Sequence, residues 1–218
     1  LWLGECPPNE LQKMPYCMKR IKAVRDFRLS SKRTSTNKLA GTPTRFQTEN
    51  MPTGTYVVIP EVSSEKRKYI PMGYMDDTVL CSNKVRIMPN ATLYHFGILE
   101  SNVHMAWMRV VCGRLKSDYD YSIKIVYNNF PWPMHNEAQK EKIEQTAQGI
   151  LDARALYPDC SLAALYDEVT MPPELRKAHQ DNDRAVMDAY GFVKGSPARI
   201  SESACVAELM KMLSLIHI

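Results

Sequence analysis

The chain has 218 residues, 44% of them hydrophobic and 24% charged, which leaves room for one large or two small domains and excludes disorder throughout. No apolar run approaches the ~18 residues of a membrane span, so a transmembrane helix is excluded. The six cysteines include no C-x-x-C pair. This pattern argues against a zinc site or a disulfide scaffold and favours reduced thiols in a cytoplasmic protein.

The formal net charge of +4 hides an uneven distribution. Residues 1–133 carry 19 Lys and Arg against 11 Asp and Glu, whereas residues 134–218 carry 9 against 13. The excess is steepest between Lys13 and Arg45, where ten cations accompany one acid, Asp26. A one-sided positive field attracts polyanions, of which nucleic acid is the commonest. The alternative is a solvated helix face.

Residues 1–45 are predicted to form a basic helix followed by a basic loop. Apolar residues recur at three- and four-residue steps over 8–30, which predicts the helix. Pro15 interrupts this pattern, so the helix either begins there or is kinked there. Over 30–44 the composition changes to Ser, Thr, Lys, Asn and Gly, which is typical of an exposed loop.

Between about residues 46 and 130 the pattern alternates between short strands and helices. β-branched runs and period-two alternation indicate strands, and three- to four-residue spacing of apolar residues indicates helices. The expected strands are at 55–60, 68–74, 79–81, 85–88 and 118–127, and the expected helices are at 93–100 and 102–115.

After Pro133 the sequence predicts helices only. Asn136 with Gln139 three residues later is a capping box, and Gly191 is placed to end a helix that begins at 172–173. Further helices are expected at 161–166 and 201–212. The predicted fold class is therefore α+β: a mixed α/β domain with short antiparallel strands, followed by a small helical C-terminal segment.

The usual catalytic motifs are absent from the sequence. It contains no G-x-G-x-x-G loop, no G-x-x-x-x-G-K-[ST] loop, no G-x-S-x-G elbow and no H-E-x-x-H pair. The acidic pair Asp76–Asp77 could bind a cation, but such pairs before a strand are usually turn formers. We therefore predict no catalytic residue and no metal site in this chain, and a small enzyme with an unrecognised site is the least favoured interpretation.

The segment 127–133, Tyr-Asn-Asn-Phe-Pro-Trp-Pro, is the most unusual in composition. It superficially resembles the Asn-Pro-Pro-aromatic loop of amino-methyltransferases, but proline follows neither asparagine directly. We expect a structural role instead, with the prolines fixing an extended exit from the preceding strand and a ring buried at the junction between the two parts.

Cationic and polar residues gather at predicted turns, which favours nucleic-acid binding. Lys, Ser and Asn suit contacts to phosphates, whereas Arg and Asn can bond bidentately to base edges. The clusters are Ser63, Ser64, Lys66, Arg67 and Lys68; Ser82, Asn83, Lys84 and Arg86; and Arg109, Arg114, Lys116, Ser117, Tyr119 and Tyr121. Composition alone does not separate DNA from RNA.

Four separate motifs, in order, resemble one family. They are Val-Ser-Ser-Glu-Lys-Arg-Lys-Tyr-Ile-Pro at 62–71, Leu-Tyr-His-Phe-Gly-Ile-Leu-Glu-Ser at 93–101, His-Met-Ala-Trp at 104–107 with Gly-Arg-Leu-Lys-Ser-Asp-Tyr at 113–119, and the segment 127–133. Together they are similar to the C-terminal portion of MmeI-like bacterial DNA methyltransferases. The resemblance extends from about Trp2 to Met212.

The resemblance implies a fragment of a larger enzyme. Members of this family are class I, adenine-specific methyltransferases of restriction–modification systems, and their S-adenosylmethionine-dependent catalytic domain precedes a target-recognition domain and a helical segment. It implies that 1–45 adjoins a catalytic domain absent from this chain, that 46–133 is the DNA target-recognition domain and that 134–212 is the helical segment. No cofactor is expected on the fragment itself. Residues 213–218 look like a translated sequencing adapter.

For the DNA partner that the resemblance implies, two sets of residues are expected at the interface. Phosphate contacts are expected from Lys66, Arg67, Lys68, Lys84, Arg114 and Lys116. Base contacts are expected from Asn83, Arg86 and Arg109, although Arg109 could equally be structural because Trp107 and Val110 beside it lie in a packed helix. The alternative to the whole interpretation is a freestanding, non-enzymatic protein that binds RNA or another acidic partner.

Overall fold

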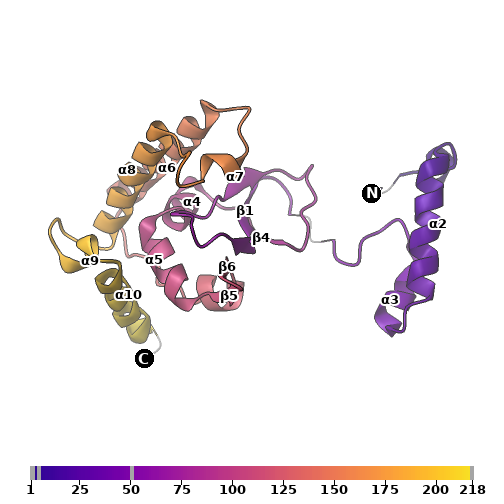
Figure 1. Ribbon diagram of the computed structural model, residues 1–218, viewed down its shortest axis with the longest axis horizontal. Coiled ribbons are helices and arrows are strands. Elements are labelled where there is room, and N and C mark those ends of the chain that lie inside the picture. Colours follow the sequence, from indigo (N-terminus) through magenta and orange to yellow (C-terminus); the bar gives the residue numbers. More distant parts are fainter. Residues whose placement is uncertain (1–2, 4–5, 50–51, 217–218) are drawn as a thin grey trace. The chain divides into compact units, whose positions relative to one another are not determined.

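The computed structural model describes residue 3, residues 6–49 and residues 52–216 (Figure 1). The chain divides into two compact units, residues 1–52 and residues 53–218, and the second contains both β-sheets. Over the described ranges no helix combines the length and the apolar character that crossing a bilayer would require.

The first unit is helical where it is described. Its elements are α1 (Pro8–Gln12), α2 (Pro15–Leu29), α3 (Thr34–Lys38) and the short 3₁₀-helix η1 (Leu39–Gly41). Pro15 lies in the first turn of α2, so the predicted interruption separates two helices and does not kink one. Proline is favoured at this position because its missing N–H would have no partner within the helix.

The prediction of a loop over 30–44 is wrong in part, because this segment contains α3 and η1. It is held against α2 by the guanidinium of Arg28, which donates to the carbonyls of Leu39, Thr42 and Arg45 at 2.9, 2.8 and 2.7 Å. Composition does not reveal a fold-back that depends on one long-range arginine.

The second unit holds two antiparallel sheets of three strands each. The first has the order β3-β1-β4, and its strands are β1 (Tyr56–Pro60), β3 (Gly73–Met75) and β4 (Val85–Pro89). The second has the order β2-β6-β5, and its strands are β2 (Val62–Ser63), β5 (Gly113–Leu115) and β6 (Asp118–Asp120). The strands expected at 55–60 and 85–88 are confirmed.

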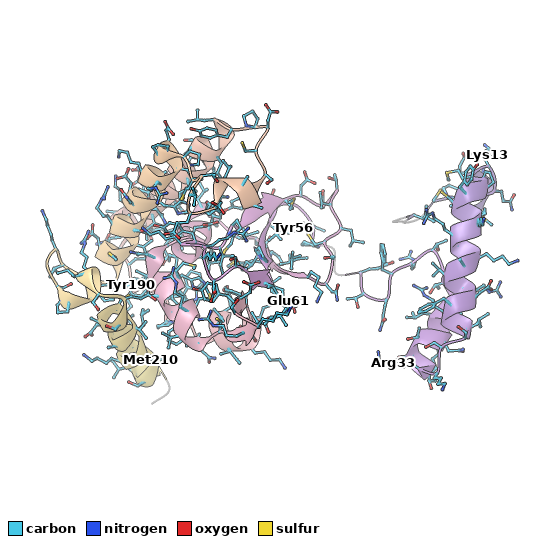
Figure 2. The ribbon with its side chains drawn as sticks, viewed as in Figure 1. Lys13, Arg33, Tyr56, Glu61, Tyr190 and Met210 are labelled. Atoms are coloured by element: carbon cyan, nitrogen blue, oxygen red, sulfur yellow. The ribbon has the colours of Figure 1, made fainter. Side chains whose placement is uncertain are left out.

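Glu61 joins the two sheets, because it lies between the end of β1 and the start of β2. Its N–H donates to the carbonyl of Lys84 at 3.0 Å, and its own carbonyl accepts from the N–H of Tyr121 at 2.7 Å. In Figure 2, Tyr56 and Glu61 lie at one end of this unit, and Tyr190 and Met210 lie at the other.

Two predicted strands are corrected. Residues 79–81 form no strand, since Asp76 makes a turn with Thr78 and the carbonyl of Val79 instead accepts from the hydroxyl of Tyr56. The hairpin partner expected at 68–74 is reduced to Gly73–Met75. The preceding residues are irregular, although Tyr69 is only 1% exposed.

The next two elements are α4 (Leu93–Leu99) and α5 (Asn102–Val111), so both predicted helices exist. The second ends earlier than expected, because Gly113–Leu115 leaves the helix to pair as β5. The strand expected over 118–127 ends at Asp120 and is followed by a π-helix, η2 (Ile123–Tyr127). The indole N–H of Trp107 donates to Val126 O at 2.9 Å and holds that π-helix in place.

The remaining elements are helical, as predicted. They are α6 (Glu137–Ala155), α7 (Leu162–Leu165), α8 (Pro173–Ala189), α9 (Pro197–Ile200) and α10 (Glu202–Ile216). The predicted capping box is confirmed, with Gln139 N bonded to Asn136 Oδ1 at 2.9 Å and Asn136 N bonded to Gln139 Oε1 at 3.0 Å. Residues 213–216 continue α10, and residues 217–218 lie outside the described residues.

One hydrophobic core connects the sheets with these helices. It contains β1, α4, α5, α6, α8 and α10, and helices α6 and α8 lie side by side over it (Figure 1). Its members include Val57, Phe96, Trp107, Ile143 and Leu175, each at most 1% exposed. The fold is the mixed arrangement of helices and small antiparallel sheets that the sequence predicts.

Candidate nucleic-acid interface

The first predicted cationic cluster forms a turn directly after β2. Lys66 N–H donates to Ser64 Oγ at 3.3 Å and Arg67 N–H donates to Ser64 O at 3.1 Å, which closes the turn. The Lys66 and Lys68 side chains are exposed, and the half-buried Arg67 guanidinium lies 3.4 Å from Ser63 Oγ. The turn therefore presents its charges outward from the end of a strand.

Most of the third predicted cluster lies on the hairpin between β5 and β6. Lys116 occupies the turn with a φ of +58°, a left-handed conformation that is uncommon for residues other than glycine. The Arg114 guanidinium stacks on the ring of Tyr119 at 4.3 Å and donates to Ser117 O at 3.1 Å. The ring of Tyr119 thus supports this arginine, and the side chains of Arg114 and Lys116 are both exposed.

The sheet order brings these two clusters together. Because β6 lies between β2 and β5, the turn after β2 runs beside the β5–β6 hairpin. Glu65 N–H approaches Asp118 Oδ1 at 3.4 Å, and the Tyr119 hydroxyl donates to Glu65 O at 3.2 Å. We call the resulting surface the basic surface; its residues are Lys66, Arg67, Lys68, Arg114 and Lys116.

The second predicted cluster, with Asn83, Lys84 and Arg86, lies at the start of β4. Arg86 Nη2 is 2.9 Å from Glu61 Oε1, and Lys84 Nζ is 3.8 Å from Glu61 Oε2. The side chain of Asn83 is exposed, in a turn where Lys84 N–H donates to Ser82 Oγ at 3.2 Å. Glu61 thus orients two predicted DNA contacts while Asn83 remains accessible.

Arg109 differs from the other predicted base contacts because both sides of its guanidinium are occupied. Nη1 is 2.8 Å from the carboxylate of Glu202 on α10, and Nη2 donates to Lys68 O at 3.0 Å. Its side chain is 23% exposed. These contacts link α5, α10 and the first basic turn, which is the structural alternative that the sequence left open.

Glu61 was not predicted to be part of this site. A signal was present, since an acid following a strand can face a cation across an antiparallel pair. The register places Pro60 opposite Val85, so Glu61 faces Lys84. Finding the pair from sequence requires knowing that β1 is bonded to β4, which lies more than twenty residues further along the chain.

The segment 127–133 is packed, in agreement with the expected structural role. Phe130 is 4% exposed and its ring centroid lies 5.6 Å from that of Trp132. The hydroxyl of Tyr190, the residue that follows α8, donates to Pro131 O at 2.8 Å. This segment therefore connects the part of the unit that contains the strands to the helices, and the amide of Asn129 is bonded to the carbonyls of Lys124 and Ile125.

The structure thus defines a class of protein: a small α+β module with cationic turns at one surface, packed against a bundle of helices. Residues 1–134 match the family model described as "MmeI, target recognition domain", and residues 135–213 match "MmeI, C-terminal domain". The chain belongs to the MmeI family and contains these two of its domains.

Two similar proteins agree with that assignment. The chain is 40% identical over 190 residues to "DNA methyltransferase A" of Bacillus subtilis (strain 168), covering 87% of this chain and 22% of the relative. It also superimposes with a TM-score of 0.92 and 44% identity on the type IIL restriction–modification enzyme MmeI, whose structure was solved in complex with DNA. That match covers all of this chain and 28% of the MmeI chain, so the chain spans about a quarter of either protein.

Proposed function

We propose that this chain is the DNA-recognition part of a site-specific adenine methyltransferase of a restriction–modification system. One observation carries the proposal: in a chain of the MmeI family, two cationic segments about 50 residues apart in sequence meet on one surface. A convergent set of cations on a rigid sheet suits the phosphates of a duplex. Methyl transfer from S-adenosylmethionine then belongs to a catalytic domain elsewhere in the parent protein.

The proposed division of labour has a physical reason. An enzyme that methylates the exocyclic amine of adenine must turn the base out of the helix, at a cost of a few kcal/mol. A domain that grips the groove and backbone offsets this cost and selects the adenine that enters the catalytic pocket. The fragment needs no catalytic group of its own for that task.

Individual roles follow from the accessibility of each side chain. We propose that Lys66, Arg67, Lys68, Lys84, Arg114 and Lys116 contact phosphates. For base readout we propose Asn83, whose amide is accessible, and Arg86, which Glu61 orients. Arg109 is retained as a prediction, but its two partners support a structural role over base contact.

Binding to duplex oligonucleotides over a salt series tests the proposal. Replacing Lys66 or Lys116 by alanine is expected to weaken binding to all sequences alike and to lower the salt slope by roughly one per lost phosphate contact. Lys142→Ala on α6, which removes an exposed lysine far along the chain, is the matched control and leaves both quantities unchanged.

Two results would reject the proposal. Folded wild-type protein that ignores duplex DNA in dilute buffer would exclude it, and an unchanged salt slope in both lysine variants would show that the basic surface is only solvated. Sequencing the DNA upstream of the gene distinguishes this proposal from the alternative of a freestanding protein. A reading frame that encodes the glycine-rich and Asn-Pro-Pro-aromatic motifs and continues into Leu1 supports the methyltransferase.

A further inference from the structure

The segment 64–72 carries three residues of the basic surface but has no strand to hold it. It leaves β2 at Ser63 and rejoins a sheet only at Gly73, where β3 begins. Its own backbone bonds are confined to short turns such as Arg67 N to Ser64 O at 3.1 Å and Met72 N to Ile70 O at 2.9 Å. Something other than a strand ladder must therefore fix its path.

Met72 is clamped by a buried ion pair. Glu100 Oε1 accepts from Met72 N–H at 2.9 Å, and Arg154 Nη1 on α6 donates to Met72 O at 2.7 Å. The two charged groups are themselves 2.7 Å apart, and the Glu100 side chain is fully buried while that of Arg154 is 9% exposed. Both polar groups of one backbone residue are thus satisfied by side chains.

Tyr69 is held by helix α8. Its hydroxyl donates to Asp183 Oδ2 at 2.7 Å, and its ring stacks on the imidazole of His179 with centroids 4.0 Å apart. Asp183 Oδ1 also accepts from the N–H of Asn102 at 2.8 Å, which ties the start of α5 to the same carboxylate. The hydroxyl of Tyr166 joins Arg154 at 2.9 Å to His179 at 2.7 Å, so the two anchors form one network.

Lys68 is fixed through its backbone as well. Its carbonyl accepts from Arg109 Nη2 at 3.0 Å, and Arg109 is bound to Glu202 on α10. Residues 68, 69 and 72 are therefore each held, directly or through one side chain, by a helix of the family's C-terminal domain.

The energetics favour a role in positioning over a role in stability. Burying an ion pair costs much of the Coulombic energy that it returns, and apolar residues of similar volume often serve stability as well. Here hydrogen bonds do not fully compensate for the removal of the Glu100 carboxylate from water, because its buried Oε2 has no hydrogen-bond partner among the described residues. What this pair provides that an apolar pair could not is a fixed geometry for the backbone of Met72.

We propose that the C-terminal helices α6 and α8 act as a positioning scaffold for the DNA-binding segment 64–72, with Arg154 and Asp183 as its positioning residues. This inference rests on the proposed function. The anchors do not touch DNA: they hold the lysines of the turn beside Arg114 and Lys116 of the neighbouring hairpin. Removing an anchor is expected to weaken binding without removing a charge from the interface.

The test uses the variants Arg154→Met, Arg154→Lys and Tyr69→Phe. Tyr69→Phe keeps the ring on His179 and loses only the bond to Asp183, so it is the variant best suited to remain folded. Arg154→Lys keeps one charged donor and is expected to restore part of the loss in Arg154→Met. Ile150→Val, one turn from Arg154 on α6 and fully buried, is the control that perturbs the helix without touching the network.

Two measurements are made on each folded variant. Amide hydrogen exchange of residues 65–72 is expected to accelerate in the anchor variants and not in Ile150→Val. Affinity for duplex DNA is expected to fall by about tenfold, which is the size of effect that losing one buried hydrogen bond produces. The salt slope is expected to stay unchanged. In contrast, Lys66→Ala lowers the slope.

The outcomes separate the two proposals. Variants that fold, exchange as the wild type does over 65–72 and bind DNA as tightly overturn the positioning role. If the wild type itself does not bind duplex DNA, the proposed function fails, and faster exchange confined to 65–72 then still decides whether the helices hold this segment.

Discussion

The guanidinium of Arg109 bridges two elements, with its Nη1 2.8 Å from the Glu202 carboxylate and its Nη2 3.0 Å from the carbonyl of Lys68. An arginine that reads a guanine needs two free N–H groups aimed at the groove. Both terminal nitrogens of Arg109 already have protein acceptors. The same residue thus connects α10 to the turn that carries Lys66.

Arg109→Ala is therefore expected to lower thermal stability and to weaken binding to every duplex by a similar factor. A base-reading arginine would instead relax the preference at one base pair, by about 1–3 kcal/mol. Methylation-site sequencing with the parent enzyme distinguishes the two results. Glu202→Gln, which leaves Arg109 in place, serves as the control. Loss of preference at a single base pair in Arg109→Ala would contradict the structural role.

Arg86 is expected to behave in the opposite way. Its guanidinium is 2.9 Å from Glu61 Oε1 through one nitrogen, and its side chain is 31% exposed. Arg86→Ala is expected to cost about 1–3 kcal/mol at one base pair and to relax specificity there. Sites methylated by the variant enzyme, read by sequencing, give the answer, and an unchanged recognition motif would reject base contact by Arg86.

Gly97 on α4 packs tightly against α6. A Cβ added at this position would lie 2.7 Å from Ile143 Cγ2 and 3.0 Å from Ala147 Cβ, both in buried side chains. Gly97→Ala is expected to destabilise the fold by about 1–3 kcal/mol, the usual cost of overpacking. Chemical unfolding in urea measures this change.

Gly149→Ala is the matched comparison. This glycine lies within α6, and an added Cβ would meet no atom within 4 Å. Alanine there is expected to stabilise the protein by about 0.5–1 kcal/mol because it restricts the unfolded chain and favours the helix. If both substitutions changed stability in the same direction, the tight contact at Gly97 would not be the cause.

Local signals account for the parts of the fold that the sequence predicts. The Asn136–Gln139 capping box and the proline at the start of α2 act within one helical turn, so their effects can be recognised in a short window. The strand at 113–115 could not be recognised in this way. Leu115 continues an apolar helical pattern and leaves it only because Gly113–Leu115 pairs with β6.

The candidate site also combines features that the sequence reveals with features that depend on the fold. The cations of both clusters can be recognised in the sequence. Their proximity depends on the strand order β2-β6-β5 and on the hydrogen bond between Tyr119 and Glu65, which are 54 residues apart. The anchor of Tyr69 on Asp183 spans 114 residues. No periodicity relates two such positions, so the network that holds the basic segment is visible only in three dimensions.

Protonation of His179 is expected to limit stability in acid. Its Nε2 is 2.7 Å from the Tyr166 hydroxyl and its Nδ1 is 3.2 Å from Glu100 O. Burial, reinforced by the nearby Arg154 guanidinium, lowers the pKa of His179 from 6.5 to about 3. Below pH 6.5 the unfolded state therefore binds a proton that the folded state does not. The stability that this group contributes is complete above pH 6.5 and is lost as the pH falls toward 3.

Three other buried groups also contribute to the pH dependence of the free energy of unfolding. Burial also lowers the pKa of His104 to about 3, which adds a loss of the same sign. Burial raises the pKa of Glu100 to about 7, against the opposing effect of Arg154, and raises that of Asp183 to about 6. In the unfolded chain the carboxyl of Glu100 loses its proton near pH 4.5 and that of Asp183 near pH 3.8. In the folded state they keep these protons up to about pH 7 and about pH 6. The carboxyls offset the histidines in the middle of the range, and their contribution to the slope fades below about pH 3.8 as the unfolded chain binds the same protons.

His179→Gln isolates one of these contributions. Glutamine can keep a donor toward Glu100 O and an acceptor toward Tyr166, but it has no proton to gain. Between pH 3 and 3.8 each of the two histidines is expected to lower the wild-type free energy of unfolding by up to about 1.4 kcal/mol per pH unit as the pH falls, and the variant is expected to lose the His179 part of that slope. Urea unfolding at closely spaced pH values measures both slopes. Equal slopes in the two proteins would mean that the imidazole of His179 titrates in the folded state much as it does in the unfolded chain.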